Sequence, residues 1–443
     1  MLALASNGNK PLTVKLTGVP ILVPPAQKTP TGMYFLSNLD YCDMIIYTFY
    51  TYTKSTEKGN EMAGEVMKDA LSKVLVHYYP VAGRLTVDGS DGRFAVDCTG
   101  DGAVFVEAEA DCDLGSVDLS KPDHVTRSKL VYKVHDAKSS IDIPPLMAQL
   151  TRFKCGGFVV GVSWNHFLGD GIAAIEFLNS WGETARGLPL SVPPFLDRTL
   201  LKSRVPLKID CRHSEYDDLE DKSSSSLNES DKEPVVFEYA HFTGEKIRKI
   251  KERVLHHGAR GGGLVTRCST FEAVVAFVWR ARVRALKMAP DQETRLMLVI
   301  SARDRLEPPL PRGYFGNAIK MMTTGTWLAR DIMDKPVSHA VKKIQDGITN
   351  CNDRIIRSTI DYIEATGATR PLGFTMIATA WYRMPMDSTD FGWGRPSRVE
   401  PVESPQYESI TFLAHDREVK SLNAFIGLPV SAMKTFQELV GQI

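Results

Sequence analysis

The sequence predicts an α/β protein made of two domains of similar size. Its 443 residues exceed the usual size of one hydrophobic core, so the length favours at least two domains. Helical and strand periodicities alternate in both halves of the chain, which is typical of α/β folds. The acidic, serine-rich stretch from His213 to Pro234 has few large apolar residues and predicts a crossover linker. We therefore expect one domain at residues 1–212, a linker at 213–234 and a second domain at 235–443.

The predicted elements of the first half begin with a helix. Apolar residues repeat at helical spacing over residues 60–80, and Pro80 helps to end that helix. Residues 92–98 and 102–110 alternate between apolar and polar side chains, as strands with one solvent-exposed face do. The second half repeats this mixture, with a strong helix at 269–286 and strands at 294–305 and 421–430.

Composition narrows the classes of function. The chain carries 53 Lys and Arg residues against 53 Asp and Glu residues, a balance that argues against broad capture of nucleic acid or anionic lipid. The seven cysteines contain no CxxC pair, and their odd number fits reduced thiols better than a disulfide framework. No apolar run approaches the roughly 20 residues that span a bilayer, and the first residues lack a signal-peptide core. We expect a cytoplasmic protein.

The stretch SWNHFLGDGIAA, residues 163–174, is the strongest candidate site. It joins a predicted buried strand at 156–165 to a predicted helix at 171–187. His166 therefore lies on a tight strand-to-helix loop, where rigid neighbours often hold catalytic groups. Asp170 directly precedes the helix, an N-cap position whose carboxylate accepts backbone N–H groups, so a structural role is expected for it. For His166 alone, a hydrogen-bonded interior histidine is the alternative to a catalytic base.

Two other kinds of site do not fit these residues. A metal centre would need further ligands, and the only adjacent histidines, His256 and His257, lie in a glycine-rich segment. The nucleophile elbow of a serine hydrolase has the form GxSxG, whereas GVSWN ends in Asn165. We therefore predict no metal site and no serine nucleophile here.

His166 and Asp170 form an HxxxD motif, and four further motifs occur elsewhere in the chain. They are YFLSNLD at 34–40, LVHYYPVAGRL at 75–85, YFGN at 314–317 and DFGWG at 390–394. Taken in this order, the five motifs resemble those of the plant BAHD acyltransferases, which move an acyl group from coenzyme A to an alcohol or amine. The resemblance extends over essentially the whole chain.

The resemblance implies a fold and a mechanism. The fold would be like that of chloramphenicol acetyltransferase, with two similar-sized α/β domains, a long crossover and a channel between the domains. His166 matches the family's catalytic histidine. An alcohol keeps its proton at neutral pH, and an imidazole with an ordinary pKa of about 6.5 is suited to remove it during attack on the thioester. Acyl-CoA would be a co-substrate, with no permanently bound cofactor and no metal.

The resemblance also assigns supporting and binding residues. Asp170 would pair with Arg303, or failing that with Arg305, and so shape the loop that aims His166. Asp390 and Trp393 of DFGWG would be architectural, with Trp393 near the channel mouth.

Substrate contacts follow from the same comparison. Ser269 and Thr270 lie in a segment that resembles one near the family's coenzyme A site. Arg383, and with it Ser37, would contact the acceptor, because a guanidinium can hold a carboxylate through two hydrogen bonds. A structural surface arginine is the alternative for Arg383. Tyr41 stands where the family commonly has a glutamine, so the resemblance is a weaker guide to acceptor contacts near this position.

The acceptor has two candidate classes. The segments around 151–199 and 427–439 resemble the branch that esterifies ω-hydroxy fatty acids and long-chain alcohols with feruloyl or related hydroxycinnamoyl groups. WYRMPMDSTDFGWGRP, residues 381–396, is similar instead to the shikimate hydroxycinnamoyltransferases. Transfer to shikimate, quinate or a polyamine amine is therefore the alternative. A non-catalytic acyl-CoA-binding protein and a hydrolase are the other classes, and the family resemblance predicts a monomer.

Overall fold

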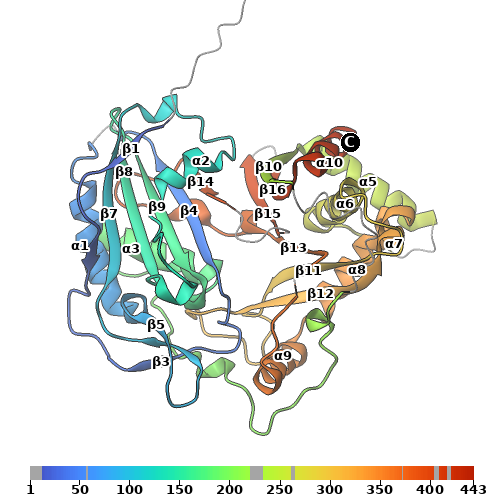
Figure 1. Cartoon of the computed structure of the whole chain (residues 1–443), viewed down its shortest axis with the longest axis horizontal. Helices are drawn as coiled ribbons and strands as arrows, with labels where there is room; N and C mark the ends of the chain where they lie inside the picture. Colours follow the sequence, from blue (N-terminus) through green and yellow to red (C-terminus); the bar gives the residue numbers. More distant parts are fainter. Residues whose placement is uncertain are drawn as a thin grey trace, which may run out of the picture.

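The computed structural model describes residues 12–55, 58–219, 233–260, 265–371, 373–403, 409–416 and 421–443. Its elements form two parts, each a β-sheet with helices packed on it, which lie side by side in Figure 1. The predicted α/β class is confirmed.

The first part is built on a seven-stranded mixed sheet in the order β1-β7-β8-β9-β4-β14, with β2 also paired to β7. Its strands are β1 (Val14–Leu16), β2 (Ile21–Val23), β4 (Ile45–Tyr52), β7 (Ala103–Ala110), β8 (Leu146–Arg152), β9 (Phe158–Asn165) and β14 (Arg398–Pro401). Helices α1 (Ala63–His77) and α3 (Gly171–Ala185) share a buried apolar cluster with this sheet. The short helix α2 (His124–Arg127) lies close to β14 in Figure 1, and Arg127 hydrogen-bonds the carbonyl oxygen of Pro401. A small sheet of β3 (Met33–Phe35), β6 (Phe94–Asp97) and β5 (Arg84–Val87) adjoins it.

The second part is a six-stranded mixed sheet in the order β10-β16-β15-β13-β11-β12. Its strands are β10 (Val235–Phe242), β11 (Glu293–Ser301), β12 (Ile319–Leu328), β13 (Thr375–Thr379), β15 (Ser409–Asp416) and β16 (Ser421–Pro429). The helices that follow or precede these strands are α5 (Gly244–Arg260), α6 (Thr270–Ala285), α7 (Ala329–Asp334), α8 (Val337–Asn350), α9 (Asp353–Thr366) and α10 (Val430–Gly441). α6 buries most of its side chains because its apolar residues occupy nearly the whole circumference.

The second half of the chain contributes one strand to the first sheet. β14 comes from the second half of the chain, yet it pairs antiparallel with β4 in the first sheet, where Val399 lies opposite Tyr50. Phe391 and Trp393 likewise pack in the apolar cluster of the first part. The division at 1–212 and 235–443 stays a prediction, and the position of β14 shows that the second segment does not pack only with itself.

The linker predicted at 213–234 begins in a packed segment. His213 and Glu215 are each only 4% exposed. His213 Nε2 lies 2.8 Å from Ser358 Oγ on α9, and Glu215 forms an ion pair with Lys320 on β12. The polar composition of this stretch wrongly predicted that these two residues would be unpacked, because polar side chains can be buried when the fold supplies hydrogen-bond partners for them. Residues 220–232 of the linker lie outside the described residues.

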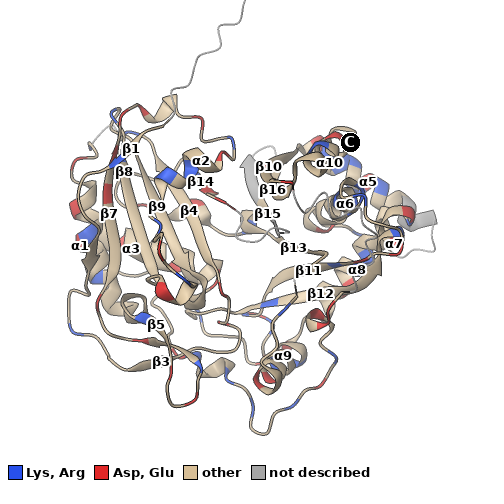
Figure 2. Ribbon diagram, viewed as in Figure 1, with Lys and Arg blue, Asp and Glu red and all other residues tan. Residues whose placement is uncertain are grey.

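Charge is distributed without large blocks of one sign. In the ribbon of Figure 2, Lys and Arg residues are interspersed with Asp and Glu residues along the elements of both parts. None of the helices in the described ranges is long and apolar enough to cross a membrane.

Candidate active site

The His166 loop is set by a buried strand. All eight residues of β9 are buried, and Asn165 at its end pairs with Ile45 of β4. The backbone N–H of His166 then donates to the carbonyl of Met44 over 3.0 Å. The half-buried side chain of His166 therefore begins directly where the central sheet ends.

Short-range hydrogen bonds fold the loop from His166 to Asp170. The side-chain oxygen of Asn165 accepts from the N–H of Phe167 at 3.2 Å, and the indole of Trp164 donates to the Gly169 carbonyl at 2.8 Å. A Cβ on Gly169 would lie 2.7 Å from the Cβ of Ala173, so the loop cannot approach the helix this closely with a larger residue there. The loop is a rigid strand-to-helix connection.

Asp170 is the N-cap of α3, as predicted. Its Oδ1 accepts from the backbone N–H groups of Ile172 and Ala173, both at 3.1 Å. The predicted ion pair with Arg303 is present, with N–O distances of 2.7 and 3.0 Å. Burial opposes ionisation, but the charge and hydrogen bonds of Arg303 hold the pKa of Asp170 below its ordinary value.

The fallback partner Arg305 lies elsewhere. Its guanidinium donates to the carbonyls of Ile348 and Cys351 at 2.9 and 2.6 Å. Asp170 also accepts from the N–H of Ala318 at 2.9 Å. Asp170 therefore joins the loop after β9 to two loops of the second part of the protein, one carrying Arg303 and one carrying YFGN.

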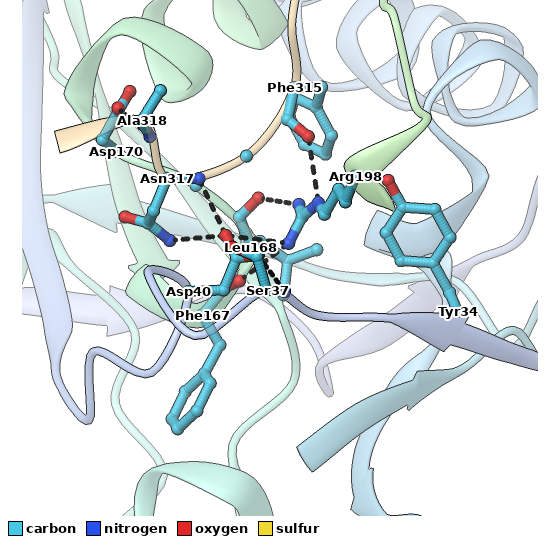
Figure 3. Close-up of polar contacts among 12 residues, drawn as sticks. Tyr34, Ser37, Asp40, Phe167, Leu168, Asp170, Arg198, Phe315, Asn317 and Ala318 are labelled. Atoms are coloured by element: carbon cyan, nitrogen blue, oxygen red, sulfur yellow. Dashed lines mark hydrogen bonds and ion pairs between the residues drawn. The ribbon is translucent and has the colours of Figure 1, made fainter. Parts of the chain in front are cut away.

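Asn317 of YFGN holds the backbone of His166 from the second part. Its side-chain amide donates to the His166 carbonyl at 2.7 Å and to Asp40 at 3.1 Å. The Asn317 backbone N–H also donates to Asp40, at 2.8 Å. Figure 3 shows Asn317 and Asp40 meeting beside this loop. The early motif YFLSNLD and the later motif YFGN thus meet at the His166 loop.

Arg198 is a supporting residue that sequence reasoning missed. Arg198 and Asp40 are both fully buried, with a closest N–O distance of 3.2 Å. The guanidinium donates to the carbonyls of Phe315, Phe167 and Leu168, as Figure 3 shows. The sequence did offer one indication of a buried role for Arg198, since it lies within the mainly apolar segment PPFLDRTLL, residues 193–201.

The thiol of Cys42, which is 8% exposed, is one of the groups that act on the charge of the His166 imidazole. Burial alone would lower the pKa of His166, but the charge and hydrogen bond of Cys42 outweigh it and raise the pKa to about 9. The pKa of Cys42 is lowered in turn, because the charge and hydrogen bond of His166 outweigh the raising effect of burial. This mutual influence was not anticipated from the sequence.

DFGWG forms a turn against α3. Asp390 Oδ1 accepts from the N–H groups of Gly392 and Gly394 at 2.7 and 2.9 Å, and both glycines have positive φ angles, which favour glycine. The Trp393 indole donates to the Gly59 carbonyl at 2.8 Å, and its ring is 9% exposed. These contacts are consistent with architectural roles for Asp390 and Trp393.

The residues predicted to contact substrates lie in different settings. Ser37 is fully buried and donates its hydroxyl to Asp40 at 2.9 Å, which does not favour contact with an acceptor. Ser269 is the N-cap of α6 and forms a capping box with Glu272, while Thr270 begins that helix. The exposed Arg383 places its guanidinium 5.4 Å from the centre of the Phe271 ring. Arg383 therefore lies beside the segment predicted to contact coenzyme A.

No metal centre is formed by the part of the chain that the structure describes. Three or more His, Cys, Asp or Glu side chains do not come together there in a way that could hold an ion.

Comparison with known proteins places this site in a family. The model of the Transferase family matches residues 13–442. The chain is 48% identical to omega-hydroxypalmitate O-feruloyl transferase of Arabidopsis thaliana, over 96% of this chain and 92% of that protein. It is 46% identical to fatty alcohol:caffeoyl-CoA acyltransferase of the same plant (95% and 96% covered), and 34% identical to shikimate O-hydroxycinnamoyltransferase of Nicotiana tabacum (95% and 97% covered).

A solved structure gives the same result for the fold. The crystal structure of vinorine synthase superposes with a TM-score of 0.75 at 21% identity, and the match covers 97% of this chain and 98% of that one. The two-part fold predicted from the five motifs is thereby confirmed. The chain belongs to the Transferase family, that of the BAHD acyltransferases, and is an acyltransferase.

Proposed function

We propose that this protein transfers a hydroxycinnamoyl group from its coenzyme A thioester to the hydroxyl group of an ω-hydroxy fatty acid or a long-chain alcohol. The observation that carries this proposal is the identity of 48% and 46%, over nearly the whole chain, to two enzymes named for these substrates. The shikimate enzyme is 34% identical. The position of Arg383 over Phe271, beside the segment predicted to contact coenzyme A, gives no support to a role in holding an acceptor carboxylate.

His166 acts as the general base in this proposal. As the acceptor hydroxyl attacks the thioester carbonyl, its proton passes to the imidazole and a tetrahedral oxyanion forms. Collapse of that intermediate breaks the C–S bond, because a thiolate is a better leaving group than an alkoxide. His166 then returns the proton to the coenzyme A sulfur. The products are the ester and free coenzyme A, and His166 ends in its starting state.

The rigid loop supports this role. A base must be held within hydrogen-bond reach of the proton that it removes. The backbone of His166 is fixed by Met44 on one side and Asn317 on the other. Asp170 and Arg303 hold the loop without contacting the reacting groups, so we assign them structural roles.

Acyl-CoA is the proposed co-substrate, and the N-terminus of α6 is its proposed contact. The N–H groups of a helix N-terminus favour anionic groups such as the phosphates of coenzyme A. Ser269, Thr270 and Arg383 lie close to this helix end. We propose further that the enzyme acts as a cytoplasmic monomer. All seven cysteines are free thiols, which fits a reducing compartment.

A mass-spectrometric transfer assay tests the proposed function. Purified protein is mixed with feruloyl-, p-coumaroyl- or acetyl-CoA and with a 16-hydroxy fatty acid, a long-chain alcohol, shikimate or spermidine. We expect ester product on the fatty hydroxyl groups with feruloyl- or p-coumaroyl-CoA. Product on shikimate or spermidine alone would overturn the acceptor assignment, and release of free acid without any acceptor would identify a hydrolase.

The role of His166 is tested in the same assay. His166→Ala should lower kcat by at least about 100-fold, the usual range for loss of a general base, while coenzyme A binding is kept. His339→Ala is the control, because His339 is also half-buried but packs against Trp327 on the other part of the protein. Equal turnover of His166→Ala and the wild type would remove His166 from the mechanism.

A further inference from the structure

The two carbonyl groups that follow His166 both accept hydrogen bonds from one buried arginine. Residues 166–168 form a single 3₁₀ turn, and the last carbonyls of such a turn have no partner within it. Because Phe167 and Leu168 are buried, these carbonyls need a partner from the protein. Arg198 donates to the Phe167 carbonyl at 3.2 Å and also to the Leu168 carbonyl (Figure 3). The main chain directly after the base is therefore held by Arg198.

The guanidinium of Arg198 has further partners that fix its own position. It pairs with the buried carboxylate of Asp40 at 3.2 Å, and its Nε donates to the Phe315 carbonyl at 3.0 Å. The ring centres of Tyr34 and Phe315 lie 5.1 and 5.6 Å from its Cζ. A planar guanidinium suits this place, because it offers five N–H donors in a rigid fork and stacks on aromatic faces.

The glycine of YFGN leaves room for this guanidinium. A Cβ built on Gly316 would lie 3.0 Å from Nε and 3.3 Å from Cζ of Arg198, which is tighter than ordinary van der Waals contact. Alanine at position 316 would therefore press on the arginine. Gly316 admits Arg198 next to the loop, and the neighbouring Asn317 binds the His166 carbonyl.

We propose that Arg198 is a positioning residue for acyl transfer, which holds the Phe167 and Leu168 carbonyls and so fixes the place of His166. This inference rests on the proposed role of His166 as the base. Arg198 acts only through the loop and takes no part in bond making. A displacement of about 1 Å can cost roughly 100-fold in rate, so loss of this anchor should affect turnover more than substrate binding.

Two substitutions test the anchor in different ways. Arg198→Lys keeps a positive charge opposite Asp40 but removes the planar fork that reaches both loop carbonyls. We expect its kcat to fall by about 10- to 100-fold, with little change in KM for feruloyl-CoA. Gly316→Ala should also lower kcat, because the new Cβ displaces the guanidinium. A wild-type kcat in Arg198→Lys would refute the positioning role.

The double variant Gly316→Ala/Arg198→Lys shows whether the two positions act together. Side chains in contact give non-additive effects, so the double variant should lose little more kcat than Arg198→Lys alone. Losses that multiply would show that Gly316 acts apart from the arginine, which would contradict the proposal.

The matched control is Arg127→Lys. Arg127 is equally buried, pairs with Glu400 and donates to the carbonyls of Leu119 and Pro401 at 2.8 and 3.0 Å. None of these partners belongs to the loop that carries the base. The control should lower the unfolding midpoint as Arg198→Lys does, but it should keep kcat. Equal losses of kcat in the two variants would show that a buried arginine affects turnover only through general stability.

Hydrogen–deuterium exchange, which needs no turnover, separates this inference from the proposed function. Mass spectrometry follows peptides covering residues 158–174 and peptides of α8. We expect Arg198→Lys to exchange faster than the wild type in the first set alone, because general destabilisation would raise exchange in both. Faster exchange there, with no acyl transfer by the wild type to any acceptor, would leave the anchor standing and refute the proposed function. Unchanged exchange in these peptides would refute the anchor itself.

Discussion

The carboxylate of Asp170 and the guanidinium of Arg303 form a two-pronged ion pair at 2.7 and 3.0 Å. The pair connects the N-terminus of α3 in the first part of the protein to the loop after β11 in the second. Asp170 is 2% exposed, so its charge is held in a place where an unpaired carboxylate would be strongly disfavoured. The aspartate of HxxxD is therefore held by Arg303 where the two parts of the protein meet.

Asp170→Asn should destabilise the protein strongly. The substitution leaves the Arg303 charge buried without its partner, and such a loss costs about 3–5 kcal/mol in the free energy of unfolding. Urea denaturation measures the effect. Asp69→Asn is the control, since Asp69 pairs with Lys73 on an exposed helix face, where an ion pair contributes about 0–1 kcal/mol. Equal costs for the two variants would show that the buried pair has no special weight.

Asn317→Ala should reduce both activity and stability. It removes the bonds from the Asn317 amide to the His166 carbonyl and to Asp40. Each lost hydrogen bond to a buried acceptor costs about 1–3 kcal/mol, and the loop loses its fixed position relative to the second part. We expect kcat to fall by about 10-fold or more, since small displacements of a base are costly. A variant with full kcat and a lowered unfolding midpoint would limit Asn317 to a structural role.

Two helical glycines should respond in opposite directions to alanine. A Cβ on Gly182 of α3 would lie 2.6 Å from the backbone oxygen of Asp390, so Gly182→Ala must displace the DFGWG turn. We expect a loss of about 1–3 kcal/mol, as for other overpacked sites. At Gly347 of α8 the nearest atom is 3.6 Å away, and alanine there should stabilise the helix by up to about 1 kcal/mol. Thermal and urea unfolding of both variants measures the contrast.

Stability should fall in acid partly through Glu215. Burial opposes its ionisation, but His213 and Lys320 outweigh burial and lower the pKa of Glu215 from 4.5 to about 2. Because the folded-state pKa lies below the unfolded one, ionised Glu215 stabilises the fold above about pH 4.5, and this contribution is lost as the pH falls toward 2. The difference corresponds to about 3 kcal/mol. Burial lowers the pKa of Lys320, so its charge depends on Glu215 as well.

The comparison is between the wild type and Glu215→Gln. The unfolding free energy of the wild type should decrease more steeply between pH 4.5 and 2 than that of the variant, because the other carboxyl groups contribute alike to both. Parallel pH dependences would show that the Glu215–Lys320 pair does not differ in protonation between the folded and unfolded chains.

Much of the local structure of the site was predictable. The apolar run before His166 predicted strand β9. The apolar residues at helical spacing after Asp170 predicted helix α3, with Asp170 as its N-cap. These features depend on neighbours within a few positions, which the sequence displays directly. The partner Arg303 came only from the family resemblance, because nothing local connects residues 170 and 303.

Other contacts were decided by the tertiary structure. His213 and Glu215 were expected in an unpacked linker, yet they are buried because Ser358 and Lys320 lie opposite them. β14 completes the first sheet although the chain places it in the second half. In each case the stabilising partner is distant in sequence, and its position depends on how the two parts pack.

The sequence by itself determined the family, the α/β class, the His166 loop and the capping role of Asp170, because each rests on a motif or on short-range periodicity. Only the tertiary structure decided what surrounds the His166 ring. It placed Cys42 where its thiol acts on the charge of the imidazole, and it joined Asp40, Arg198 and Asn317 beneath the loop. The physical reason is that burial and charge pairing depend on which distant segments meet, and local sequence patterns do not show which segments these are.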